Sequence, residues 1–157
     1  MFEDGVDALV ARFSAHAASV ELASRVEGSP LLECLADGVV LHVFERTGPY
    51  LAALGPARVI VQPETATLTR LEVDDPAPER SIEVTAVSAV TACGVVRLRE
   101  DPFVVVDAGL PLVVAVDELP DGVQAGDRVR FQSRPPLHGF VLPPQAGRVT
   151  VPTDDLV

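Results

Sequence analysis

From Val20 onward, the chain consists of short β-branched runs separated by Gly, Pro and Asp. This punctuation is typical of strands joined by tight turns and leaves few segments long enough for a helix. Val occupies 27 of the 157 positions and hydrophobic residues make up 48% of the chain, which is enough to bury a core. The pattern predicts a mainly β fold, either two small barrels or one merged β-sandwich.

The expected strands fall into two sets. The first set comprises residues 20–27, 31–36, 39–45, 57–62 and 67–73, and the second comprises residues 81–90, 94–99, 103–107, 112–116, 127–133 and 137–142. Between the sets lies a charged segment with two prolines, which a central strand does not accept. We therefore divide the chain into a first β module (19–73), a linker (74–80), a second β module (81–142) and a tail (143–157), with a last short strand at 148–151.

The first residues, 1–18, are the one persuasive helical segment. Val6, Leu9, Val10 and Phe13 are spaced three and four apart, which places them on one stripe of an amphipathic helix. A barrel that fills its own core leaves this stripe without a partner. We therefore expect it to dock on the first module or on another subunit, which would give a homo-oligomer. A second, shorter helix is expected at 50–54.

The two halves resemble each other in sequence. Ser-Val-Glu-Leu at 19–22 corresponds to Ser-Ile-Glu-Val at 81–84, and Arg-Val-Ile-Val-Gln at 58–62 corresponds to Arg-Val-Arg-Phe-Gln at 128–132. This pattern predicts a tandem duplication, and chance similarity in a Val-rich chain is the alternative. The second half runs as a long strand, a hairpin, a loop, a Gly126-Asp127 turn and two strands. This order resembles the OB-fold, a five-stranded Greek-key barrel, and implies two OB-like barrels in tandem if the duplication is real.

No motif for catalysis or metal binding is present. The three histidines and two cysteines lack the spacings of a zinc site, and no Gly-x-Ser-x-Gly elbow occurs. The chain has no lysine, which removes P-loop and pyridoxal phosphate chemistry. We therefore predict no catalytic residue, no metal and no cofactor, and consider an enzyme less favoured than a binding protein. Cys34 and Cys93 are interpreted as buried free thiols, with a disulfide as the alternative.

Four arginines and one phenylalanine are the candidate ligand contacts. Arg97 with Arg99, and Arg128 with Arg130, alternate with apolar residues, so each pair projects from one face of its strand. With Phe103 available for stacking, this resembles the groove of an OB-type protein that binds single-stranded nucleic acid. The alternative, which we favour, is that cross-strand ion pairs with carboxylates occupy the arginines.

The charge balance points to a different partner. A net charge of −11 repels phosphates and disfavours nucleic acid, whereas it suits a basic protein. The acidic start has no secretory signal, and no apolar run reaches the ~20 residues of a membrane span. The tail at 152–157 resembles the acidic, apolar tips by which bacterial single-stranded DNA-binding proteins recruit partners. We predict a non-catalytic cytoplasmic binding or assembly module that acts through protein contacts, with single-stranded nucleic-acid binding as the alternative.

Overall fold

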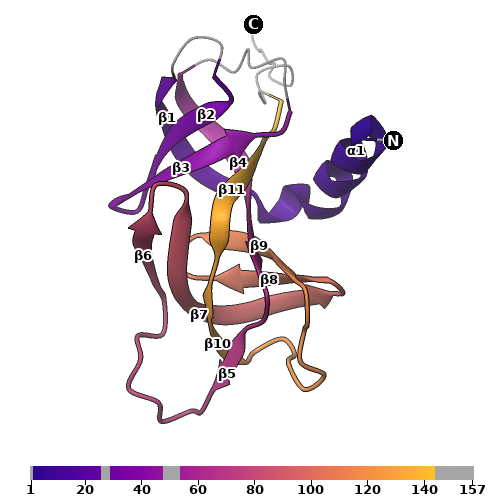
Figure 1. The fold of residues 1–157 in the computed structure, drawn as a ribbon, viewed down its shortest axis with the longest axis vertical. Helices are drawn as coiled ribbons and strands as arrows, with labels where there is room; N and C mark the ends of the chain where they lie inside the picture. Colours follow the sequence, from indigo (N-terminus) through magenta and orange to yellow (C-terminus); the bar gives the residue numbers. More distant parts are fainter. Residues whose placement is uncertain (1, 26–28, 48–53, 144–157) are drawn as a thin grey trace, which may run out of the picture.

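The computed structural model describes residues 2–25, 29–47 and 54–143 (Figure 1). Helix α1 (Phe2–Phe13) continues into one turn of 3-10 helix, η1 (Ser14–His16), and the rest of these residues form strands and turns. In chain order the strands are β1 (Ala18–Arg25), β2 (Leu31–Ala36), β3 (Val39–Glu45), β4 (Gly55–Thr65), β5 (Thr69–Leu71), β6 (Ser81–Ala86), β7 (Ala89–Glu100), β8 (Phe103–Asp107), β9 (Pro111–Val116), β10 (Arg128–Gln132) and β11 (Arg134–Val141). The mainly β fold with an N-terminal helix is confirmed. The helix expected at 50–54 and the strand expected at 148–151 lie wholly or almost wholly outside the described residues.

Five strands close into a barrel. β1 pairs with β2, β2 with β3, β3 with β11, β11 with β4, and β4 again with β1; only the β3–β11 pair is parallel. β11 can approach β3 closely because it has a glycine at position 139, where an added Cβ would lie 2.6 Å from Cγ2 of Val43. The barrel thus depends on a strand that the chain supplies almost a hundred residues after β3.

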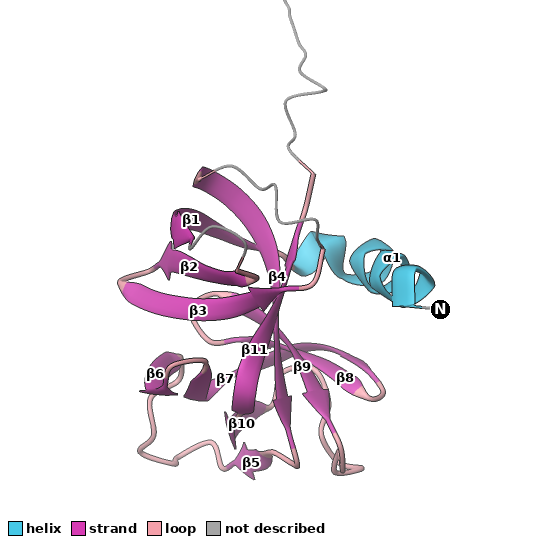
Figure 2. Cartoon of the chain, turned by 45° about the horizontal axis from the view of Figure 1, so that its top comes forward, coloured by secondary structure: helices cyan, strands magenta, loops and turns pink. Residues whose placement is uncertain are grey.

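The remaining strands extend the same sheet away from β4. The last residues of β4, Glu64 and Thr65, run parallel to Ala115 and Val116 of β9. From β9 the sheet continues through β8, β7 and β10 to β5, and β6 forms a hairpin with β7. Figure 2 shows β4 and β11 running from the closed barrel into this second group of strands. One continuous sheet therefore contains all eleven strands of the described residues.

Two strands pair differently from our expectation. Residues 137–142 were expected to end the second module, but β11 lies between β3 and β4 of the closed barrel. Residues 67–73 were expected to end the first module, but β5 pairs with β10. The alternation of apolar and polar residues determines which side chains are buried, whereas it does not select between two neighbouring strands of similar pattern. The linker at 74–80 carries no strand, and the module boundaries themselves stay a prediction.

Helix α1 covers an apolar cluster on the outside of the strands. Phe13 is fully buried there, and Val6, Leu9 and Val10 pack against the same cluster. Its other buried members come from β4, β8, β9, β11 and the residue after β11: Ile60, Val105, Val113, Phe140 and Leu142. The apolar stripe of α1 therefore docks on its own chain and bridges the barrel to the added strands. Each large side chain buried in this way contributes roughly 1.5–3 kcal/mol.

Candidate functional site

Arg97 and Arg99 do not share a face, because a β-bulge interrupts β7 between Val96 and Leu98. Arg97 donates to Oδ2 of Asp107 at 2.9 Å. Arg99 is paired with Val104, whose side chain belongs to the inner core. The Arg99 side chain therefore leaves the backbone on the inner face of β7. The same bulge turns Leu98 toward α1 instead of the core, contrary to strict alternation.

Both arginines have structural partners. Arg99 donates to the carboxylate of Asp101 at 2.7 and 3.1 Å, and to the carbonyls of Pro120 and Val123 at 2.7 Å each. It therefore holds the loop between β9 and β10 against β7, and its hydrogen bond keeps the pKa of Asp101 below the usual value. Burial raises the pKa of Asp107, but hydrogen bonds from Arg97, the Gly109 N–H and Arg80 outweigh burial and lower it overall.

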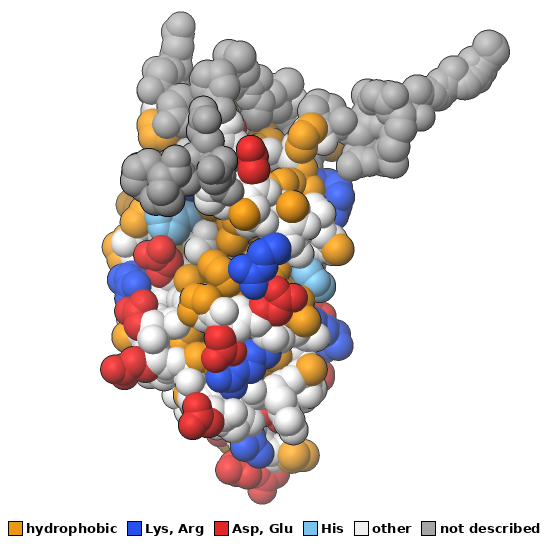
Figure 3. All heavy atoms as spheres, turned by 90° about the vertical axis from the view of Figure 1, so that its right-hand side faces the viewer, with side chains coloured by type: hydrophobic (Ala, Val, Ile, Leu, Met, Phe, Trp, Pro, Cys, Tyr) orange, Lys and Arg blue, Asp and Glu red, His pale blue; other side chains and the backbone are white. Residues whose placement is uncertain are grey.

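Arg128 and Arg130 lie on the outer face of β10 and differ in their engagement. The Arg128 guanidinium donates to carbonyls of the linker region, at 2.7–3.2 Å from Glu72, Val73, Asp75 and Ala77. Arg130 is exposed and makes no hydrogen bond or ion pair with the described part of the chain. On the face of the molecule drawn in Figure 3, basic side chains are interspersed with acidic ones and form no separate cationic patch.

Phe103 belongs to the cluster under α1. Its aromatic ring meets that of Phe13 edge to face, with 5.3 Å between centroids, and the Arg12 guanidinium lies 5.6 Å from its centroid. The five predicted contact residues therefore do not form one free surface. Their role as ligand contacts stays a prediction, and among the four arginines Arg130 is the one left without a partner in the described residues.

A groove lies between the β2–β3 hairpin and the β6–β7 hairpin, with a volume of about 640 Å³. Its walls are formed by Gly38, Val39, Val40 and His42 on one side and by Ile82, Val84, Thr85, Ala86 and Val87 on the other. One hydrogen bond ties the two hairpins together, from Oγ of Ser88 to the carbonyl of His42 at 2.6 Å. We call this the β3–β6 groove.

Both walls of the β3–β6 groove include a strand without a pairing partner on one side. β3 pairs with β11 only at residues 43–45, so residues 39–42 have β2 as their single neighbour among the described strands. β6 pairs with β7 alone. An unpaired strand edge presents backbone N–H and C=O groups that another extended chain can use. Both edges therefore leave backbone groups available to an additional extended chain beside the groove.

The side chains of the β3–β6 groove are apolar and unusually exposed. Val40, Val84 and Val87 are 40%, 45% and 69% exposed, and Leu35, which pairs with Val40 across the hairpin, is 39% exposed. Single exposed apolar residues are ordinary, whereas several around one groove make it a candidate docking surface. Sequence alternation places Val40 and His42 on the outside of β3, but the convergence of this face with β6 was not visible from the sequence.

The charges around the β3–β6 groove are acidic. Oε2 of Glu33 lies 3.7 Å from Nε2 of His42, which lines the groove. Glu83 does not line it, because it alternates with Ile82 and Val84 on β6 and therefore starts from the opposite face. None of the residues that line the groove is an arginine or lysine. The lining itself carries no carboxylate, so the net charge of −11, together with Glu33 beside His42, is what favours a basic ligand.

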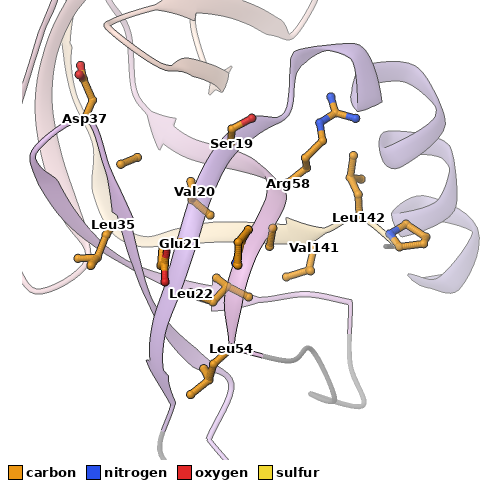
Figure 4. A pocket seen from close by; sticks show the side chains of 14 residues that line it. Ser19, Val20, Glu21, Leu22, Leu35, Asp37, Leu54, Arg58, Val141 and Leu142 are labelled. Carbon is orange, nitrogen blue, oxygen red and sulfur yellow. The ribbon is translucent and has the colours of Figure 1, made fainter. Parts of the chain in front are cut away.

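A second concavity, of about 740 Å³, lies over β1, β4 and the end of β11 (Figure 4). It contains Glu21, Asp37 and Arg58 among mainly apolar residues, and Arg58 donates to the carbonyl of Ser14 at 2.8 Å. Leu54 and Pro143 on its wall adjoin ranges that the structure does not describe.

The described residues contain no group of three or more His, Cys, Asp or Glu side chains that would hold a metal ion. Cys34 and Cys93 are buried free thiols, as expected, and burial raises the pKa of Cys34 to about 12. Within the described ranges, no helix has both the length and the apolar character needed to cross a membrane. Comparison with known proteins finds no matching family model, curated protein or solved structure.

Proposed function

We propose that the protein is a non-catalytic binding module whose β3–β6 groove accepts an extended segment of a partner protein. The observation that carries this proposal is the pair of strand edges that line one groove, each without a strand partner on that side among the described residues. An extended segment that enters between them gains backbone hydrogen bonds, as in other cases of strand addition. Alternate side chains of such a segment would contact Val40 and Val84.

The partner segment is expected to combine apolar and basic side chains. Apolar residues would cover the exposed valines, while arginine or lysine at an alternate position would meet Glu33 beside His42. Complementary charge also speeds encounter and disfavours acidic competitors. A basic partner segment agrees with the net charge of −11 and with the proposal of a cytoplasmic protein that recruits a basic partner.

The barrel supports an OB-like assignment of the fold, because its first strand, β1, lies beside its fourth, β4. Barrels of this type bind their ligands on strand faces and loops. Nucleic acid is the less favoured ligand here, because Arg97, Arg99 and Arg128 are held by carboxylates or carbonyls. Single-strand binding would therefore depend on Arg130.

A labelled peptide of about eight residues that alternates valine and arginine is the appropriate first probe. We expect fluorescence anisotropy to show binding that weakens as salt rises. A peptide that alternates valine and glutamate should bind far less, and one with proline at the valine positions should fail because proline lacks the N–H needed for strand pairing.

Val84→Asp should weaken peptide binding at least about tenfold, or ~1.4 kcal/mol. Val73→Asp is the matched control, since Val73 is 94% exposed and does not line the groove. Equal affinity of the two variants would contradict the proposal. Binding of a single-stranded oligonucleotide that disappears with Arg130→Ala would favour the nucleic-acid alternative instead.

A further inference from the structure

The strands outside the closed barrel repeat its pattern of neighbours. β7 pairs with β8 and β8 with β9 in antiparallel hairpins, and β10 pairs with β7, as β4 does with β1. The parallel neighbour of β9 is the end of β4, and the antiparallel neighbour of β10 is β5. Since β5 follows β4 after three residues, the β4–β5 segment completes a second five-membered barrel.

The first four strands of the two barrels correspond at separations of 71 to 73 residues along the chain. β2 and β8 begin at residues 31 and 103, and β3 and β9 begin at residues 39 and 111, which is 72 residues in both cases. Equivalent hydrogen bonds recur outside the regular strand pairs. The Arg46 N–H donates to Gly139 O at 2.8 Å, and the Glu118 N–H donates to Ala66 O at 2.8 Å.

A second pair of hydrogen bonds joins corresponding strand ends, with donors 71 and acceptors 72 residues apart. The Glu45 N–H donates to Pro30 O at 2.7 Å, and the Val116 N–H donates to Pro102 O at 3.0 Å. In this pair, the donors Glu45 and Val116 are the last residues of the third strands, β3 and β9. The acceptors Pro30 and Pro102 directly precede the second strands, β2 and β8. Such recurrence of hydrogen bonds at corresponding strand ends is stronger evidence for repetition than similarity among valines.

We infer that the chain is a duplicated barrel in which the two copies have exchanged their fifth strands. β11 follows β10 along the chain but completes the barrel of β1–β4, whereas the β4–β5 segment completes the barrel of β7–β10. Each half of the chain is therefore the obligate partner of the other. This inference is independent of the β3–β6 groove and goes beyond the proposed function.

The buried ends of the exchanged segments show what the exchange stabilises. Leu137 on β11 and Leu68 just before β5 are 1% and 4% exposed, and both belong to the inner core. Removing either half would leave a barrel with one wall missing and an apolar interior exposed to water. The cost of such exposure scales with the apolar area uncovered.

Cleavage of the folded, full-length chain tests the interlock. A protease site placed between Pro78 and Glu79, both exposed in the linker, separates the two halves covalently without removing a strand. We expect the cut protein to remain one particle of the uncut size in native buffer and to separate only in denaturant. Two separate folded fragments in native buffer would overturn the inference.

The two buried thiols report on the two barrels separately, because Cys34 lies on β2 and Cys93 on β7. Gly139→Val adds a side chain against Val43 of β3, so exchange predicts that the reaction rate of Cys34 with a thiol reagent rises more, relative to the unsubstituted protein, than that of Cys93. Two barrels without exchange predict the reverse, because position 139 belongs to the second half of the chain.

Gly122→Val, in the same half, is the matched control, since an added Cβ there lies 3.6 Å from its nearest neighbour and should leave both thiols protected. If Gly139→Val does not fold, the smaller Gly139→Ala change gives the same comparison under milder strain. A rise at Cys34 of at least about threefold over Cys93 supports the exchange. Equal rises in the two reaction rates, or a larger rise at Cys93, would overturn it.

Discussion

Two outer surfaces with apolar side chains differ in whether the described chain covers them. Under α1, Phe13 is fully buried beside Ile60 and Phe140. In the β3–β6 groove, Val40 and Val84 stay 40% and 45% exposed. The chain thus supplies an amphipathic segment for one surface and none of its described residues for the other. This contrast is the reason to assign stability to the covered surface and recognition to the open one.

Phe13→Asp should produce the largest effect on the free energy of unfolding. Loss of a buried phenylalanine alone costs about 3–5 kcal/mol, and an aspartate in its place adds the cost of burying a charge. Urea unfolding followed by circular dichroism measures the change. A loss below about 1 kcal/mol would show that the surface under α1 does not contribute to stability.

The same aspartate placed in the groove sharpens the contrast. Val84→Asp should change the free energy of unfolding by no more than about 0.5 kcal/mol, because the side chain is half exposed and its carboxylate stays in water. Its effect should appear in peptide binding instead. Destabilisation comparable to that of Phe13→Asp would remove the distinction between the two surfaces.

The arginines of β10 offer a smaller comparison of the same kind. Arg128→Ala removes hydrogen bonds to four carbonyls, two in the linker and two just before it, and should cost about 1–3 kcal/mol. Arg130→Ala, on an exposed side chain, should stay within about 0.5 kcal/mol. Thermal and urea unfolding of both variants provide the measurement, and equal losses would contradict the structural role given to Arg128.

Much of the fold follows from the sequence. Alternation and turn residues predict most strands, and the spacing of Leu9, Val10 and Phe13 predicts α1 and its buried face. The expected strand at 81–90 is a hairpin instead, because the chain turns at Val87 and Ser88 between β6 and β7. The exchange of β5 and β11 was not predictable, since two strands of similar pattern can complete either barrel.

The candidate site was less accessible to sequence reasoning than the fold. Alternation places Arg97 and Arg99 on one face, but a bulge between them shifts the register, and bulges leave no reliable mark in a single sequence. The β3–β6 groove combines residues more than forty positions apart. Each wall looks like an ordinary half-exposed strand until the tertiary arrangement brings the two together.

The smallest expected effect is a pH dependence on the covered side, where His138 shares a face of β11 with Phe140. Burial lowers the pKa of His138, against the opposing charge of Glu64, whose Oε2 lies 3.5 Å from Nε2. The unfolded chain therefore takes up this proton more readily, and stability should fall as the pH drops below the ordinary histidine value of ~6.5.

His138→Gln should reduce that dependence by a few tenths of a kcal/mol, a rough figure for a half-buried group. Unfolding free energies at about pH 7.5 and about pH 5.5 give the comparison. Identical slopes for the variant and the original protein would show that His138 does not carry the effect.

Hydrogen exchange with and without the valine–arginine peptide tests the central claim most directly, because it reports on backbone pairing in each strand edge. If the β3–β6 groove accepts an extended segment, amides in residues 39–42 and 81–86 should both gain protection when the peptide is present. Amides in β8 and β9, beneath α1, should not change. Protection confined to β10 around Arg130, or no protection in either edge while the peptide is bound, would contradict the account.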